Sequence, residues 1–162
     1  KFNKVMRTIL ISFALLVVSM VCKAQDINSI FDKFKHRDNV VFVDVPKELI
    51  SLGLKSSGNK ESEKWAKKID HLRILTLEDA NRSTKRDFKK MIETFSWKDY
   101  NDIVKVNDNG EKVRIMTQGT DELIKRLIIC SFDKEDCVLV VIDGSILPKD
   151  IDGIVNDTTI GK

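Results

Sequence analysis

The sequence predicts a single-domain α+β fold, with helices packed on one face of a mostly antiparallel sheet of about six strands. Apolar residues recur at helical spacing in the first part of the chain, whereas later they alternate with the period of two that is typical of strands. Short turns join the late strands, so these strands are expected to be antiparallel. The chain has 162 residues, 42% hydrophobic and 33% charged, which is the size and composition of one globular domain.

The start of the chain predicts a secretory signal peptide. A basic beginning precedes an apolar run over residues 9–21, which is shorter than the roughly 18–20 residues that a membrane-spanning helix needs. Small residues stand three places before and one place before a cut after Ala24. The sequence therefore predicts a leader over residues 1–24, cleavage between Ala24 and Gln25, and export to the periplasm or cell envelope.

Two alternatives for this leader stay open. The first is an uncleaved membrane anchor. The second is a lipoprotein signal, in which Cys22 is lipidated and the protein attaches to the outer membrane, although the residues before Cys22 depart from the usual lipoprotein pattern. Beyond the leader, we expect one α+β domain over residues 25–155 and a flexible tail over residues 156–162.

Removal of the leader changes the charge balance. Four of the 28 bases lie in the leader, so 24 bases remain against 25 acids, a net charge of −1. The excess of bases that would suit nucleic-acid binding disappears with the leader, and no nucleic-acid partner is predicted. Two cysteines remain, Cys130 and Cys137, which are too few for a small fold held together by disulfides.

Helical spacing begins directly after the leader. Asp26 precedes apolar residues at i, i+3, i+4 and i+7, which predicts a helix capped by Asp26. A β-branched run over residues 40–45 predicts a strand. Pro46 and Gly53 then flank a short helix over residues 47–52. The apolar residues of the first helix are Ile27, Ile30, Phe31 and Phe34.

The middle of the chain alternates between helix and strand. Residues 55–63 are polar and predict a loop. Apolar spacing then predicts a helix over residues 62–70 and a strand over residues 72–77. Ser83 is the expected cap of the next helix, whose apolar face contains Phe88, Met91, Ile92 and Phe95.

The late strands form two predicted hairpins. Asn109 and Gly110 both tolerate positive φ, so they favour a type I′ turn. The resulting register places the apolar side chains of both strands on one face. The expected partners are Asp108 with Glu111, Val106 with Val113, and Val104 with Ile115.

The second hairpin joins strands over residues 123–132 and 137–142. The latter strand is apolar on both faces, which predicts a central or doubly covered position. Pairing of Phe132 with Cys137 makes Cys130 a diagonal neighbour of Cys137, about 7–8 Å away, so two free buried thiols are expected. A register shifted by one pair would instead allow a disulfide. Pro148 begins a last short helix.

The sequence predicts no catalytic residue, no cofactor and no metal site. His36 and His71 have no second histidine or cysteine at ligand spacing. Residues 53–58 lack the spacing of a nucleophile elbow, and residues 107–110 lack the carboxylates of a calcium loop. Three carboxylates leave acid–base chemistry as a minor alternative: Asp143, Asp150 and Asp152.

One surface has an uneven charge. Bases recur at helical spacing on the helix after Ser83, opposite its apolar face. Such a stripe suits lipid head groups or an acidic partner, although an ordinary solvated helix face explains the same pattern. The bases are Arg82, Lys85, Arg86, Lys89 and Lys90.

Several segments carry a resemblance to a known family. They read IDHLRILT at residues 69–76, VNDNGEKVRI at 106–115 and VLVVIDGSILPKDI at 138–151. Together with Ile30-Phe31, they resemble domain-of-unknown-function family 4252, over about residues 26–155. The resemblance implies a small exported envelope protein of Gram-negative bacteria, often a lipoprotein, with no assigned catalytic residue and a connection to envelope stress or signalling.

These observations favour a non-catalytic envelope module that binds a protein, a peptide or a surface. A hydrolase-type enzyme with an unrecognised active site is the first alternative. The second is a regulatory partner that contacts the membrane peripherally through the basic stripe. Neither the partner nor the oligomeric state follows from the sequence.

Overall fold

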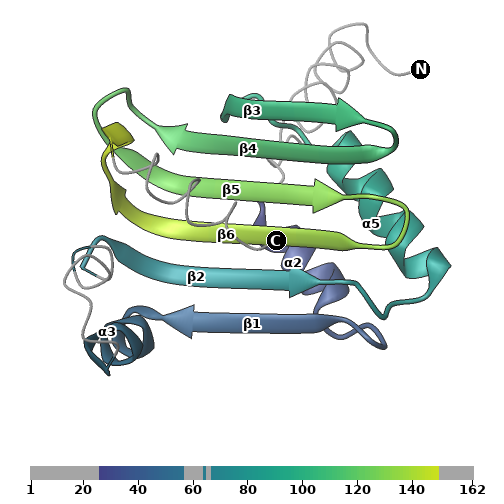
Figure 1. Ribbon diagram of the computed structural model, residues 1–162, viewed down its shortest axis with the longest axis horizontal. Coiled ribbons are helices and arrows are strands. Elements are labelled where there is room, and N and C mark those ends of the chain that lie inside the picture. The colour runs from purple at the N-terminus through teal and green to yellow at the C-terminus, as the bar shows by residue number, and fades with distance from the viewer. Residues whose placement is uncertain (1–25, 57–63, 65–66, 150–162) are drawn as a thin grey trace, which may run out of the picture.

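A computed structural model describes residues 26–56, 64 and 67–149, and these form one six-stranded antiparallel sheet with helices against it (Figure 1). The strand order is β1-β2-β6-β5-β4-β3. The predicted α+β class and antiparallel sheet are therefore confirmed. The helices are α2 (Asn28–Phe34), α3 (Lys47–Ser56) and α5 (Arg82–Thr94). The strands are β1 (Val41–Pro46), β2 (Ile69–Thr76), β3 (Asn101–Asp108), β4 (Glu111–Gly119), β5 (Ile124–Phe132) and β6 (Cys137–Ile146).

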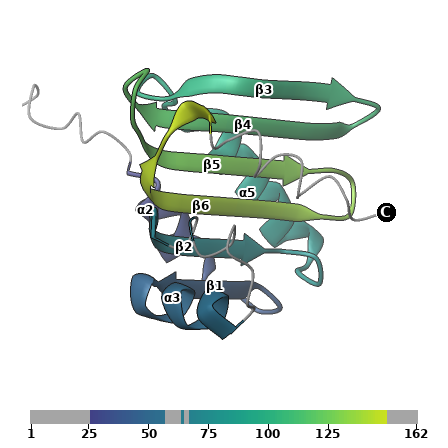
Figure 2. The ribbon, with the colours of Figure 1, turned by 60° about the vertical axis from the view of Figure 1, so that its left-hand side comes forward.

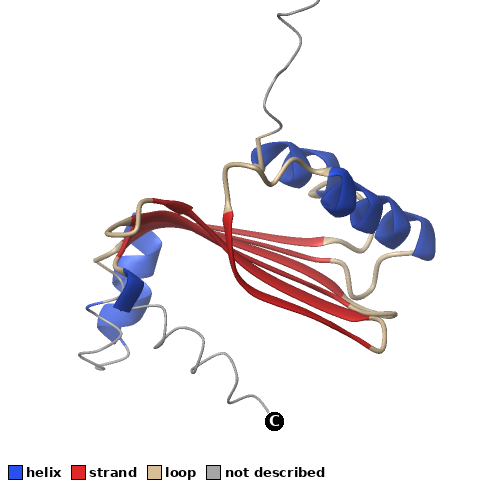
Figure 3. Cartoon of the chain, turned by 90° about the horizontal axis from the view of Figure 1, so that it is seen from above, coloured by secondary structure: helices blue, strands red, loops and turns tan. Residues whose placement is uncertain are grey.

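Helices α2 and α5 form the predicted layer on one face of the sheet, as the view from above shows (Figure 3). Helix α3 lies apart from this layer, at the ends of β1 and β2 (Figures 1 and 2). It connects those two strands and is longer than the predicted 47–52, because Gly53 does not end it. Its residue Ile50 is buried, at 8% exposure.

The main core lies between the helical layer and the sheet. The apolar residues of the first predicted helix all point into it, so that prediction is confirmed. Phe34 of α2 meets Phe88 of α5 edge to face, with ring centroids 5.4 Å apart. The sheet side of this core includes Leu75, Met116, Ile128, Leu139 and Val141. A second apolar cluster, around Leu127 and Ile142, lies on the opposite face of the sheet.

Both predicted helix caps are wrong. Ile27 is the N-cap of α2, without a side-chain cap bond, while Asp26 accepts a 3.3 Å bond from the Asn28 backbone N–H. Asn81, not Ser83, caps α5: its Oδ1 accepts from the Thr84 N–H at 2.9 Å. Asn81 has the extended backbone of an N-cap, which starts the helix two residues earlier than the sequence predicted.

The predicted helix over residues 62–70 is wrong at its end. Ile69 and Asp70 belong to β2, because Ile69 pairs with Gly144 of β6. Strand pairing here overrides a helical spacing of apolar residues. Residues 62, 63, 65 and 66 of that predicted helix lie outside the described residues, as do the leader, the tail and the helix predicted from Pro148 after its first two residues.

Both hairpin registers are confirmed. Asn109 and Gly110 have φ of 47° and 94°, and all three predicted partners of the first hairpin are opposite one another. In the second hairpin, Phe132 pairs with Cys137 and Cys130 with Leu139. Strand β6 is central, between β2 and β5, as its apolar faces predicted. No helix in the described part of the chain is long and apolar enough to cross a membrane.

Candidate functional site

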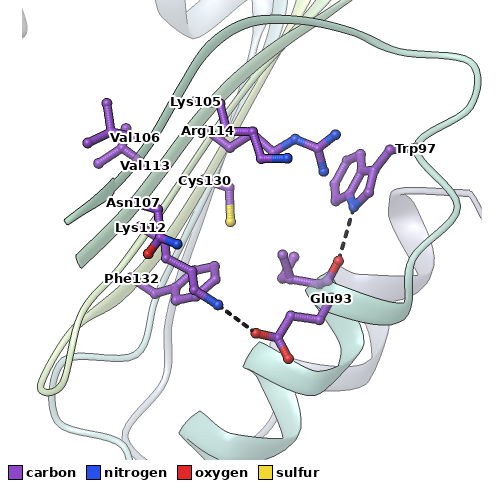
Figure 4. Close-up of a pocket in the computed structure, with 11 residues that line it drawn as sticks. Glu93, Trp97, Lys105, Val106, Asn107, Lys112, Val113, Arg114, Cys130 and Phe132 are labelled. Carbon is purple, nitrogen blue, oxygen red and sulfur yellow. Dashed lines mark hydrogen bonds and ion pairs between the residues drawn. The ribbon is translucent and has the colours of Figure 1, made fainter. Parts of the chain in front are cut away.

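A groove opens between the C-terminal half of α5 and the β3–β4 hairpin, on the helical side of the sheet (Figure 4). It exists because β3 and β4 extend the sheet past the helix that covers β5 and β6. Its volume is about 230 Å³. The lining side chains come from α5, the segment after it, and strands β3, β4 and β5: Ile92, Glu93, Trp97, Lys105, Val106, Asn107, Lys112, Val113, Arg114, Cys130 and Phe132.

Trp97 forms a fixed aromatic wall of the groove. Its indole N–H donates to the Ile92 carbonyl at 3.0 Å (Figure 4), and its ring lies 4.4 Å from Phe95 and 5.5 Å from Tyr100. The polar atom of the indole is therefore satisfied by its own chain. The apolar surface of the ring is what Trp97 offers to a ligand.

Three cations of the groove lie on one face of the β3–β4 hairpin, and the valines of the hairpin lie on its other face. The cations are Lys105, Lys112 and Arg114. Arg114 pairs with Asp102, Nε to Oδ1 at 2.5 Å, and lies 5.2 Å from the Trp97 ring. This hydrogen bond lowers the pKa of the Asp102 carboxyl below its ordinary value. Lys112 pairs with Glu93 at 2.9 Å.

The third cation, Lys105 of β3, is the cross-strand partner of Arg114 of β4, and the two side chains lie beside each other in Figure 4. Among the residues that the structure describes, Lys105 has no hydrogen-bond or ion-pair partner. The charge of Lys105 acts on Asp102, but that carboxylate bonds Arg114, and Glu93 bonds Lys112. Three cations therefore share two carboxylates, and the groove keeps a net positive charge. The groove can therefore attract an anion.

The far wall of the groove is formed by Phe132, which has two cations near its ring. Lys112 Nζ is 5.5 Å from the ring centroid and Lys89 Nζ is 5.9 Å from it. Distances below about 6 Å are favourable for cation–π contacts. The groove thus has two aromatic walls, Trp97 and Phe132, with a cation beside each, Arg114 and Lys112.

Cys130 lines the groove, but its chemistry is that of a buried apolar side chain. Burial raises the pKa of the Cys130 thiol to about 12, and the neighbouring Cys137 adds to the shift. The thiolate is the reactive form of cysteine, so this thiol is a poor nucleophile at neutral pH. Both cysteines are free and buried in the structure, as the hairpin register predicted.

The predicted basic stripe divides into two parts. Lys85 donates to the carbonyls of Glu78, at 2.6 Å, and Glu135, and Lys89 donates to the carbonyl of Asp133. These two lysines are half-buried and hold the end of the β5–β6 hairpin. The other three bases are exposed on the outside of α5: Arg82, Arg86 and Lys90.

A second polar cluster lies at the opposite end of the helical face. Asp143 accepts from Arg73 at 2.7 Å and from Arg126 at 2.5 Å, and it is therefore a shared counter-ion of two arginines. The Arg73 guanidinium lies 4.9 Å from the Phe31 ring. This arrangement explains Asp143 as a structural carboxylate. Asp150 and Asp152, predicted with it, lie outside the described residues.

The two predicted histidines lie apart. His71 Nε2 is hydrogen-bonded to Asp44 Oδ1 across β1 and β2, and His36 is exposed beyond α2. No group of three or more His, Cys, Asp or Glu side chains that could hold a metal occurs among residues 26–56, 64 and 67–149.

Sequence reasoning missed Lys105, Lys112 and Arg114 as site residues. The signal was present, because the register that places the valines of the hairpin on one face places these three bases on the other. Their meeting with Trp97 and Phe132 required the packing of α5, which no sequence pattern indicated.

Comparison with known proteins gives one match. A family model described as "Domain of unknown function (DUF4252)" matches residues 34–154. This match agrees with the resemblance seen in the sequence. No curated protein and no solved structure matches the chain significantly.

Proposed function

The chain belongs to the DUF4252 family, and because that description assigns no activity, we propose its function from the groove: a non-catalytic module that binds an acidic protein or peptide segment. The observation that carries this proposal is the unbalanced charge of Lys105 between two aromatic surfaces, Trp97 and Phe132. The signal-like leader supports a place of action in the periplasm or cell envelope.

The size of the groove favours part of a polymer over a complete small molecule. Small-molecule pockets are usually about 300–1,000 Å³, whereas this groove holds about 230 Å³. Such a volume accepts one or two side chains. Protein interfaces are often anchored in this way, by an aromatic or aliphatic side chain in a pocket with charges around it.

The chemistry of the lining favours an apolar anchor next to a carboxylate. Trp97 and Phe132 offer apolar surface, and Arg114 and Lys112 have their charges partly met by Asp102 and Glu93. Lys105 is the cation that a ligand carboxylate reaches without displacing an internal partner. A segment with an acidic side chain close to an apolar one matches this pattern.

The hydrolase alternative receives no support from the groove. A hydrolase of the nucleophilic type needs an activated side chain, and burial raises the pKa of the Cys130 thiol to about 12. The membrane-surface alternative rests on the three exposed bases of α5, and the experiment below separates it from the groove.

The test is binding of a fluorescent peptide of alternating glutamate and phenylalanine, followed by anisotropy. Lys105→Glu reverses the unbalanced charge, and we expect it to weaken binding about tenfold, equivalent to about 1.4 kcal/mol. The matched control is Lys90→Glu, the same change on the outside of α5, which should leave the affinity unaltered. Equal loss in both variants, or loss only in Lys90→Glu, would contradict the groove as the binding site.

A second probe tests the charge requirement. A peptide in which lysine replaces every glutamate keeps the apolar side chains and should not bind to the unaltered protein. Equal affinity for both peptides would mean that apolar contact alone drives binding, against the proposal. Anionic vesicles should be bound no better than neutral ones.

A further inference from the structure

Exposed apolar side chains gather at one edge of the molecule. Among the described residues, six large apolar side chains are exposed, and four of them lie on β1 and the helix that follows it. Val41 and Val43 are on β1, at 57% and 39% exposure, and Leu49 and Leu52 are on α3, at 55% and 64%. Strand β1 is the last strand of the sheet, with α3 beside its end (Figures 1 and 2).

The two edges of the sheet are built differently. The other edge strand, β3, has features that hinder pairing with another chain: a lysine, Lys105, and a bulge at Ile103 that interrupts the ladder. Strand β1 reads VFVDVP and has no lysine, and its register with β2 runs without a bulge from Val41 to Pro46. An edge strand with unpaired backbone groups and β-branched side chains is a template for another strand.

From this asymmetry, we infer that the edge of β1 pairs antiparallel with β1 of a second copy of this chain, so that two sheets join into one. A two-fold axis makes any strand edge complementary to itself in antiparallel pairing, which is why a second copy fits this edge. The axis lies perpendicular to the sheet and passes midway between Val43 and Val43 of the second copy.

This register groups the apolar side chains of one face. Val43 lies opposite Val43 of the second copy, and Val41 lies opposite Val45, so six valines form one continuous apolar row. On the other face, Asp44 lies opposite Phe42. A register centred one residue further along would place the two Asp44 carboxylates opposite each other, which is unfavourable.

The polar side chains near this edge have partners in their own chain. Asp44 Oδ1 is hydrogen-bonded to His71 Nε2, and Lys47 is paired with Asp70 at 2.5 Å. The register centred on Val43 keeps the two Asp44 carboxylates from facing each other. Stable interfaces bury about 800 Å² per partner, and one short strand buries less than this. Leu49 and Leu52 of α3 therefore add to the contact. The dimer forms in a concentration-dependent way.

The experiment is sedimentation velocity of the purified protein over a range of concentrations. The unaltered protein should pass from monomer to dimer as its concentration rises. Val43→Lys should remain monomeric at every concentration, whereas Val106→Lys, the same change at a similarly exposed valine on β3, should dimerise normally. A monomeric unaltered protein, or a dimer lost in Val106→Lys and kept in Val43→Lys, would overturn the inference.

A cross-link tests the register without depending on a destabilising charge. Directly opposite residues of antiparallel strands have Cα atoms about 4.5–5.5 Å apart, which suits a disulfide. Val43→Cys should therefore form a covalent dimer on mild oxidation, while Val106→Cys and the unaltered protein, with its buried cysteines, should not. If Val43→Cys gives no dimer, or Val106→Cys gives as much, the proposed pairing is wrong.

Discussion

Replacing Asp143 with asparagine should destabilise the fold more than the same replacement of Asp102, which pairs with Arg114 on the same sheet. Asp143 is the shared counter-ion of Arg73 and Arg126, whose side chains are 9% and 21% exposed. The variant keeps the shape of the side chain and removes its charge. Arg73 then retains the amide oxygen of Asn28 and the Phe31 ring, but no carboxylate.

The magnitude follows from burial. Breaking a fully buried ion pair costs about 3–5 kcal/mol, and exposed pairs contribute about 0–1 kcal/mol. Because Asp143 itself is 22% exposed, we expect a loss of about 2–3 kcal/mol, below the fully buried range. For a chain of this length, that corresponds to a fall in Tm of about 4–12 °C.

The assay is thermal and urea unfolding of Asp143→Asn beside Asp102→Asn. Asp102 meets a single arginine, Arg114, and is 37% exposed, so its change should cost about 0–1 kcal/mol. The two variants remove the same charge from the same sheet. If both lose the same stability, or if Asp143→Asn loses none, the reasoning from shared and buried charge is refuted.

Three further predictions concern the core, the cysteines and the leader. Phe88→Ala should cost about 3–5 kcal/mol in urea unfolding, because the ring is fully buried against Phe34; a loss below about 1 kcal/mol would contradict that packing. Since burial raises the pKa of Cys130 to about 12, the native protein should resist alkylation at mildly alkaline pH. The protein unfolded without reductant should take up a label at both Cys130 and Cys137. Labelling only after reduction would instead mean that the two cysteines form a disulfide. The intact mass of exported protein should correspond to a chain beginning at Gln25, and a lipid-sized increment on Cys22 would establish the lipoprotein alternative.

The local parts of the fold were predictable from the sequence. The type I′ turn at Asn109-Gly110 and the alternating valines agree on one register, and α2 follows from apolar spacing over two turns of helix. In each case neighbouring residues carry all of the information. The helix predicted up to residue 70 failed because Ile69 pairs with β6, an interaction with residues more than seventy positions away.

The candidate site was less predictable, for the same physical reason. Lys85 and Lys89 look like members of a solvated stripe, yet they donate to carbonyls of a hairpin that lie 50 and 44 positions away, respectively. Conversely, Lys105 and Trp97 have no common sequence pattern and line one groove only because α5 leaves the β3–β4 hairpin uncovered. Local periodicity predicts which face of an element is polar, but not which polar side chains find partners across the fold.

The most direct measurement of the central claim is an NMR titration of the labelled protein with the glutamate–phenylalanine peptide. Binding in the groove predicts that the indole N–H of Trp97 and the backbone amides of residues 105–114 shift together and saturate at the same affinity as the anisotropy. Shifts confined to the outside of α5, at Arg82, Arg86 and Lys90, or no shift at any peptide concentration, would contradict the groove as the site where this protein binds an acidic partner.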